Sequence, residues 1–172
     1  MNGIGKLSVT KWARTLPAKA VVLDLGCGTG IPVSMVLVNQ GMTVYGIDAS
    51  PTMVRAFQQN FPNNPVACEA VEESLFFNRK FDAVIAWGLI FLLPAEVQET
   101  VIQKAAKALR RGGKFLFTAT GQTNEWKDAM TNQHSISLGP EKYKELLAAS
   151  GLSLIEEFEG EGQNHYLNAV RI

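Results

Sequence analysis

The chain has 172 residues, 47% of them hydrophobic and 19% charged, which is typical of a globular protein with a sizeable core. Sixteen basic and sixteen acidic residues give a formal net charge of zero, which disfavours electrostatic binding of nucleic acid or of an anionic membrane. Two cysteines make no disulfide framework, and no apolar run approaches the roughly 20 residues of a membrane span. These features predict a cytoplasmic protein with one domain over residues 1–172 and no signal peptide.

Apolar runs and helical spacing alternate along most of the chain. They predict, in order, a short N-terminal cover (1–20) with a helix around 8–15, a strand at 21–25, a helix at 31–40, a strand at 43–47, a helix from Pro51 to about Asn60, a strand at 65–68, a strand at 81–87, a helix from Pro94 closed by Gly112-Gly113, and a strand at 114–120. Such alternation favours right-handed crossovers, and therefore a parallel sheet with helices on both faces.

The last third of the chain has a different pattern. Residues 121–138 form the one long irregular segment, which we expect to act as an active-site lid. A helix follows from Gly139-Pro140 to Ser150-Gly151, and then strands at 152–158 and 165–172 flank a glycine-rich turn. Because this turn is too short for a crossover, the two strands must form an antiparallel hairpin.

A glycine-rich turn follows the first predicted strand, within Val-Val-Leu-Asp-Leu-Gly-Cys-Gly-Thr-Gly at 21–30. Glycines allow positive φ and let a ligand approach the backbone amides. In the dinucleotide fingerprint the third glycine would stand at Ile31, and Asp24 would repel a pyrophosphate. The pattern therefore favours a cationic or zwitterionic ligand over a dinucleotide.

A second acid, Asp48, ends the second predicted strand, about twenty residues beyond Gly26. An acid in this position can bind both hydroxyls of a ribose. Ligands of open α/β sheets bind beyond the carboxyl ends of the strands, where the strand order reverses. We therefore expect the glycine turn, Asp48, Glu69 and Trp87 to meet at one edge of the sheet.

At this point the sequence resembles the class I S-adenosylmethionine (SAM)-dependent methyltransferases. The resemblance rests on Asp24-Leu25-Gly26-Cys27-Gly28-Thr29-Gly30 and on Gly46-Ile47-Asp48, and it extends to Ser50-Pro51-Thr52-Met53, Cys68-Glu69-Ala70, Phe81-Asp82-Ala83-Val84-Ile85 and Leu109-Arg110-Arg111-Gly112-Gly113-Lys114. Two positions depart from the family pattern: Arg111 replaces a proline, and Glu69 replaces a shorter acid.

The resemblance implies an α/β fold, a single-domain, doubly wound, mostly parallel seven-stranded sheet of order 3-2-1-4-5-7-6 with strand 7 antiparallel. It implies that SAM is the cofactor and S-adenosylhomocysteine the product, with in-line transfer of the methyl to an N, O or S nucleophile, mainly through positioning and desolvation. Relatives that methylate base amines carry an Asn/Asp-Pro-Pro-aromatic step where this chain has Ala86-Trp87-Gly88-Leu89. A small-molecule acceptor, with no nucleic acid and no membrane, is therefore expected.

The same resemblance assigns roles around the cofactor. The glycines would admit its methionine moiety, Asp24 would orient the ammonium, and Asp48 would hold the ribose. Glu69 and the Ala70 amide would meet the adenine edge. Met53 would either pack on the adenine face or be a methionine of the core. The predicted cofactor-binding set is Asp24, Gly26, Cys27, Gly28, Gly30, Asp48, Ala49, Met53, Glu69, Ala70 and Trp87.

Catalytic candidates are His165, Trp87 and His134. Trp87 could present an aromatic face to the sulfonium or simply be buried. His134 lies in the predicted lid, where a solvated surface position is the alternative. His165 and Tyr166 begin the last strand and point to opposite faces, so at most one can look into the pocket. The glutamates at 156–161 have no histidine at metal-ligand spacing, so no metal is predicted.

Three functional classes fit these observations. The first is a small-molecule methyltransferase, and the second is a SAM-binding accessory or regulatory protein without catalysis. The third is a nicotinamide-dependent oxidoreductase, which Ile31 and the lack of a catalytic domain oppose.

Overall fold

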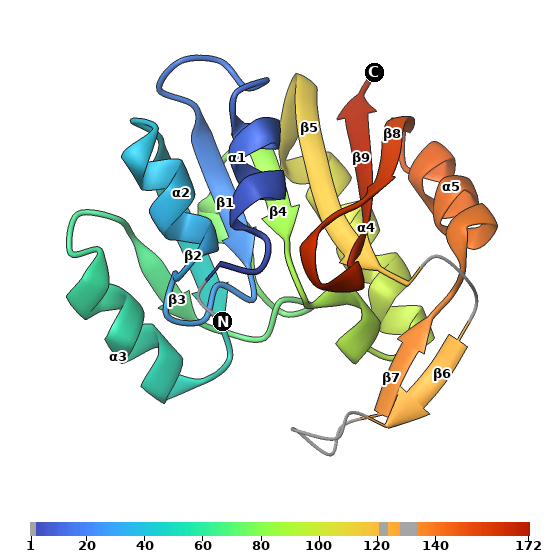
Figure 1. Ribbon diagram of the computed structural model, residues 1–172, viewed down its shortest axis with the longest axis horizontal. Helices are drawn as coiled ribbons and strands as arrows, with labels where there is room; N and C mark the ends of the chain where they lie inside the picture. The colour runs from blue at the N-terminus through green and yellow to red at the C-terminus, as the bar shows by residue number, and fades with distance from the viewer. Residues whose placement is uncertain (1–2, 121–123, 128–133) are drawn as a thin grey trace.

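The computed structural model describes residues 3–120, 124–127 and 134–172, with backbone only for 124–127 and His134. A seven-stranded sheet of order β3-β2-β1-β4-β5-β9-β8 runs through the molecule (Figure 1). Its strands are β1 (Val21–Leu25), β2 (Thr43–Asp48), β3 (Val66–Cys68), β4 (Phe81–Ala86), β5 (Leu109–Ala119), β8 (Leu152–Glu159) and β9 (His165–Arg171). The first five are parallel, and β9 is antiparallel to both β5 and β8. The predicted fold class and strand order are therefore confirmed.

Five α-helices cover the two faces of this sheet. They are α1 (Lys6–Ala13), α2 (Val33–Asn39), α3 (Pro51–Asn60), α4 (Ala95–Ala108) and α5 (Pro140–Ala149), with single 3-10 turns at Phe76–Asn78, Ile90–Leu92 and Glu161–Gln163. One buried cluster joins the sheet to α4 and α5, and a second joins it to α1, α2 and Phe57 of α3. Figure 1 accordingly shows α1 in front of the sheet and α4 behind it.

The start of β5 differs from the prediction. Helix α4 ends at Ala108, before the Gly112-Gly113 pair that was expected to close it, and β5 begins at Leu109 rather than Lys114. Leu109 is fully buried and pairs with Phe81, whereas Lys114 pairs with Ala83, so the strand bulges between them. The glycines therefore allow a bulge in the strand, and burial of Leu109 decides where the helix ends.

The sequence predicted that the segment 121–138 is irregular, but part of it forms two strands. Strands β6 (Asn124–Lys127) and β7 (His134–Ser137) pair antiparallel, and in Figure 1 this ribbon extends away from the main sheet below α5. Buried Gln98 of α4 donates to the Ile136 carbonyl oxygen at 2.8 Å, which ties β7 to the domain. The remainder of the predicted lid, 121–123 and 128–133, lies outside the described residues.

Over the residues that the structure covers, every helix is too short or too polar to cross a bilayer. The cytoplasmic location expected from the sequence stays a prediction.

Candidate functional site

A cleft of about 340 Å³ opens at the carboxyl ends of β1 and β4, on the edge of the sheet expected from the sequence. Most of its wall comes from the glycine turn and the start of α2. The cleft is lined by Asp24, Gly26, Cys27, Gly28, Thr29, Ile31, Pro32, Val33, Met53, Trp87 and Gly88.

The glycine turn presents open backbone to this cleft. The amides of Gly26 and Cys27 both donate to the carbonyl oxygen of Ile47, at 2.8 and 3.0 Å, which fixes the turn against β2. Gly28 has φ 56°, and a Cβ added there would meet no atom of the described residues within 4 Å. A ligand can therefore approach the Gly28 backbone without a side chain in the way.

Asp48 lies at the end of β2 and holds this turn in place. Its Oδ2 accepts a hydrogen bond from the Gly28 amide at 2.9 Å, and its Oδ1 accepts one from the Ser50 amide at 2.9 Å. Each carboxylate oxygen has capacity for a further hydrogen bond. Asp48 can therefore support the turn and still accept from the hydroxyls of a ligand.

Asp24 forms the buried acidic part of the cleft wall, with 2% of its surface exposed. Ser34, in the first turn of α2, donates to its Oδ2 at 2.7 Å. Burial raises the pKa of the Asp24 carboxyl to about 7, the Ser34 hydrogen bond opposes this, and the charge of Asp48 adds to it. A ligand cation beside Asp24 would favour the ionised carboxylate.

Cys27 fills space between the turn and β2. Burial, together with the charges of Asp24 and Asp48, raises the pKa of its thiol, so the thiol is neutral and a weak nucleophile. A Cβ added at Gly46 of β2 would lie 2.7 Å from Cys27 Sγ and 3.2 Å from Phe57. Packing therefore requires glycine at position 46.

We expect Gly46→Ala to lower the free energy of unfolding by about 1–3 kcal/mol, because the added methyl overpacks the site. Urea unfolding followed by circular dichroism would measure this change. Cys27→Ala in the same chain should restore part of the loss, since it removes Sγ. Gly3→Ala is the control, because no described atom lies within 4 Å of its added Cβ. Equal stabilities of Gly46→Ala and the original chain would contradict the packing explanation.

Of the other predicted cofactor residues, some line the cleft and others do not. Met53 is 41% exposed and lines the cleft, which favours the binding role over the core alternative. Glu69 follows β3 at the same edge, where its amide donates to the Asp48 carbonyl oxygen. Five predicted residues are absent from the cleft wall, although they lie along the same edge of the sheet; they are Gly30, Asp48, Ala49, Glu69 and Ala70.

Trp87 lies between the cleft and the N-terminal helix. Its Nε1 donates to the Tyr166 hydroxyl at 2.9 Å, and a Cβ added at Gly5 would lie 2.7 Å from that nitrogen. The indole thus lines the cleft and also packs against the second buried cluster. Sequence reasoning missed Tyr166 as the partner of Trp87, because nothing in the spacing of the two residues links them.

His165 lies on the opposite face of β9 from Tyr166, as strand alternation requires. Its Nε2 lies 2.6 Å from Glu157 Oε1, and this hydrogen bond lowers the pKa of the Glu157 carboxyl. Lys144 of α5 forms an ion pair with Glu157 at 3.4 Å. His165 Nδ1 is buried and has no partner among the described residues. Tyr166, rather than His165, therefore lies beside Trp87.

His134 has its backbone in β7, and its side chain lies outside the described residues. In the described part of the chain, no group of three or more His, Cys, Asp or Glu side chains could hold a metal ion. Sequence reasoning also missed Ser34, the partner of Asp24, and Thr29, Pro32 and Val33 of the cleft wall. Their closeness in sequence to the glycine turn was the available signal.

Known proteins are similar to this chain over the region that forms the cleft. A model of a methyltransferase domain family matches residues 22–113. A putative methyltransferase, YqeM, of Bacillus subtilis is 39% identical over 80 residues, which are 44% of this chain and 32% of that protein. A tRNA U34 carboxymethyltransferase of Cellvibrio japonicus is 32% identical over 120 residues, which are 62% of this chain and 36% of that protein. The chain thus spans about a third of the length of these two relatives.

Among solved structures, magnesium protoporphyrin IX methyltransferase of Synechocystis PCC 6803, crystallised with bound SAM, has the same fold. The TM-score is 0.77 at 22% identity, over 97% of this chain and 78% of that one. The matched residues 22–113 contain the glycine turn, Asp48 and Trp87, and make up more than half of the chain. The protein therefore belongs to this methyltransferase domain family.

Proposed function

We propose that this chain binds SAM in the cleft and transfers its methyl group to a nucleophilic N, O or S atom of a small molecule. The observation that carries the proposal is the hydrogen bond from the Gly28 amide to Asp48, beside the buried Asp24. The cleft wall thus holds one buried carboxylate and an unobstructed backbone, and a second carboxylate, Asp48, is hydrogen-bonded to that backbone at Gly28, as the family relationship leads one to expect.

The residues of the cleft fit the charges of SAM. The α-ammonium group can pair with Asp24, whose burial strengthens the interaction with a cation. The ribose hydroxyls can donate hydrogen bonds to the carboxylate oxygens of Asp48, which already accept hydrogen bonds from the amides of Gly28 and Ser50. A pyrophosphate would meet two carboxylates instead, and this disfavours a dinucleotide.

Catalysis by this chain would consist mainly of positioning. When bound, SAM supplies a methyl group that its sulfonium already activates. The glycine turn would orient the donor, and Trp87, Ile31 and Met53 would limit the access of water from the open side of the cleft. Alignment alone can supply roughly 7–11 kcal/mol of barrier reduction, so an amine or thiolate acceptor needs no strong base.

A small-molecule acceptor is part of the proposal. The net charge of zero gives no excess of positive charge for a nucleic acid. The apolar rim of Ile31, Met53 and Trp87 favours an acceptor with an apolar part. Since one relative is named as a tRNA-modifying enzyme, RNA belongs in the test as the competing acceptor.

Calorimetric titration with SAM, S-adenosylhomocysteine and NAD tests the cofactor. We expect the first two to bind and NAD not to bind; binding of NAD alone would contradict the proposal. Labelled SAM, incubated with a metabolite panel and separately with total RNA, tests the acceptor. Label in a metabolite supports the small-molecule assignment, whereas label in RNA alone overturns it.

His165 is proposed to act on the acceptor side of the reaction. We expect His165→Ala to lower kcat about tenfold or more and to leave SAM affinity unchanged, because the imidazole lies outside the cleft wall. Glu157→Gln is the matched variant, since it keeps the ring and removes the charge of its partner. An equal effect of Glu157→Gln on kcat would assign the pair a positioning role. A weakened SAM affinity in His165→Ala would contradict the assignment.

A SAM-binding accessory protein without catalysis is the second candidate function. The observation that favours it is the state of His165, with Nε2 bonded to Glu157 and Nδ1 buried. For His165 to act on an acceptor, its ring would first have to leave Glu157, whereas an accessory protein needs no such movement. SAM binding with no label transferred to any metabolite or RNA would support this candidate.

A further inference from the structure

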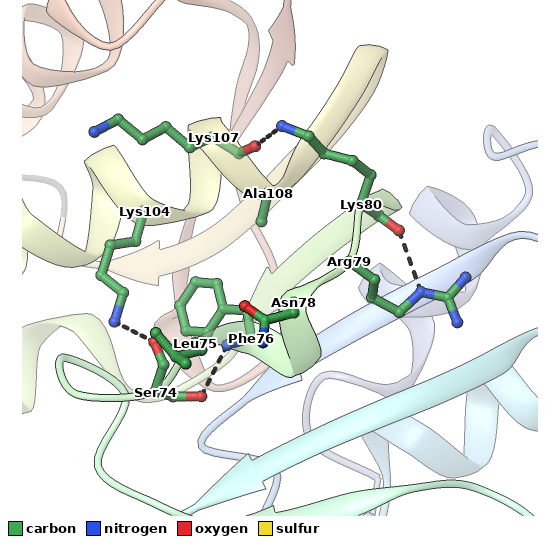
Figure 2. Close-up of a pocket in the computed structure, with 9 residues that line it drawn as sticks. All are labelled: Ser74, Leu75, Phe76, Asn78, Arg79, Lys80, Lys104, Lys107 and Ala108. Carbon is green, nitrogen blue, oxygen red and sulfur yellow. Dashed lines mark hydrogen bonds between the residues drawn. The ribbon is translucent and has the colours of Figure 1, made fainter.

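A second cavity, of about 380 Å³, lies between the last turns of α4 and the segment that leads into β4 (Figure 2). It shares no lining residue with the cleft described above. Its wall consists of Ser74, Leu75, Phe76, Asn78, Arg79, Lys80, Lys104, Lys107 and Ala108. Four of these residues are basic and none is acidic.

The four cations differ in their availability to a ligand. In Figure 2 the Arg79 guanidinium points away from Phe76 and Ala108. It donates to the Tyr45 hydroxyl and lies 4.6 Å from the centre of the Tyr45 ring. Lys104 Nζ donates to the carbonyl oxygens of Val71 and Ser74, at 2.9 and 2.6 Å. These two side chains contribute charge, but their hydrogen bonds are directed at the protein.

Lys80 and Lys107 are the exposed cations of the cavity. Lys80 Nζ donates to the Lys107 carbonyl oxygen, and the Lys107 ammonium has no hydrogen bond or ion pair with any described side chain (Figure 2). A neutral carbonyl leaves the charge of Lys80 uncompensated. Glu69 and Glu72 act on Lys104 electrostatically, yet neither lines the cavity. The local positive charge is therefore open to an anion.

The wall between these cations is apolar. Phe76 and Ala108 are buried, and the Phe76 ring centre lies 4.7 Å from Lys104 Nζ. Leu75 is 73% exposed, although it borders a cavity that could cover it. An apolar group seated here would remove the leucine side chain from water, which favours binding.

The backbone that forms this wall is strained. Phe76, Phe77 and Asn78 have φ of 50°, 58° and 52°, a left-handed turn that is unfavourable for residues other than glycine. Burial of Phe76 and the edge contact of Phe77 with Tyr45 hold the turn in place. The turn leaves Leu75 exposed and Phe76 buried, which gives the cavity an apolar wall next to its lysines.

We propose that this cavity binds an organic anion, with one phosphate or carboxylate group held by the ammonium group of Lys80 and an apolar body against Leu75, Phe76 and Ala108; the exposed Lys107 side chain, which points away from Lys80 in Figure 2, would rotate to add its ammonium group to the same anion. Such a ligand is either a soluble phosphomonoester or the headgroup of an anionic lipid. The site lies apart from the methyl-donor cleft, so the proposal is independent of the proposed function.

Octyl phosphate is the probe, titrated by calorimetry into the protein without SAM. We expect binding that is at least about tenfold tighter than that of inorganic phosphate or octanol alone, because only octyl phosphate uses both parts of the site. Lys80→Gln/Lys107→Gln should weaken it by about tenfold or more. Lys6→Gln/Lys142→Gln, with the same charge change at exposed positions outside the cavity, should bind as the original chain does.

Two single variants keep the test decisive should the double variant fold poorly. Lys107→Gln removes the charge of a side chain that has no described partner, and Leu75→Ser replaces an exposed apolar side chain. Both variants should bind octyl phosphate more weakly than the original chain does. Only Lys107→Gln should bind inorganic phosphate more weakly. Vesicles of phosphatidylcholine with and without phosphatidate separate the two sources: lysine-dependent binding to phosphatidate vesicles assigns a lipid, and its absence assigns a soluble ligand. Equal binding of octanol and octyl phosphate, or equal losses in both double variants, would overturn the proposal.

Discussion

Asp48→Ala is expected to weaken SAM binding by at least about tenfold, the largest loss that we predict for a single side chain. The carboxylate is proposed to accept from the ribose hydroxyls, and it also accepts the Gly28 and Ser50 amides, which shape the turn. Its removal therefore takes away direct contacts and loosens the glycine turn. The two lost backbone hydrogen bonds should lower the free energy of unfolding by about 1–3 kcal/mol. Calorimetry and urea unfolding measure these two effects.

Asp82→Ala is the matched control for this variant. Asp82 also accepts a backbone amide, that of Val21 at 2.8 Å, and it pairs with Arg110, but it lies at the other edge of the sheet. It should therefore cost stability without changing SAM affinity. Unchanged SAM affinity in Asp48→Ala would remove Asp48 from the cofactor site. Equal losses of affinity in both variants would show that general destabilisation, rather than ribose binding, is responsible.

SAM affinity is expected to rise more than tenfold between about pH 5.5 and about pH 7, because Asp24 must ionise to pair with the ligand ammonium. The pKa of Asp24 is raised to about 7, chiefly by burial, so most of the free protein carries a neutral carboxyl at the lower pH. The ligand ammonium stays protonated over this interval, since α-amino groups titrate at about 7.7–8.0. Calorimetry in buffers of different ionisation enthalpy would also detect the proton that Asp24 releases on binding.

Asp24→Asn removes the titrating group and is the matched variant. Its SAM affinity should be lower at pH 7 and independent of pH over the same interval. Methylthioadenosine, which lacks the ammonium, should bind the original chain without this pH dependence. A rise in SAM affinity of the same size in Asp24→Asn would exclude Asp24 as its source.

The same raised pKa affects the stability of the free protein. The native state keeps a proton on Asp24 up to about pH 7, whereas the unfolded chain releases it near the ordinary value of 3.8. The native state therefore binds more protons over this interval, and the contribution of Asp24 to stability falls as the pH rises. Between about pH 4 and about pH 7, the original chain should therefore lose free energy of unfolding relative to the Asp24→Asn variant, and above about pH 7 the difference between the two should stay constant.

Local sequence signals predicted most of the architecture of this protein. Apolar runs and glycine stops are properties of short segments, so they located the parallel strands, the glycine turn and the final hairpin. The same signals placed Asp48 at a strand end, where its carboxylate now holds the Gly28 amide. The predicted end of α4 was wrong, because it depends on the burial of Leu109. The β6–β7 ribbon was missed, because the hydrogen bond from Gln98 of α4 holds it. Both depend on residues distant in sequence.

The sequence by itself determined the fold class, the strand order implied by the family resemblance, and the edge of the sheet where the cleft lies. Only the tertiary structure decided which face of β9 each ring occupies, and so placed Tyr166 beside Trp87 and His165 beside Glu157. It also decided that Asp24 is buried with Ser34 as its partner. The physical reason is that periodicity specifies opposite faces, whereas burial, and with it the pKa of a carboxyl, depends on what packs against each face.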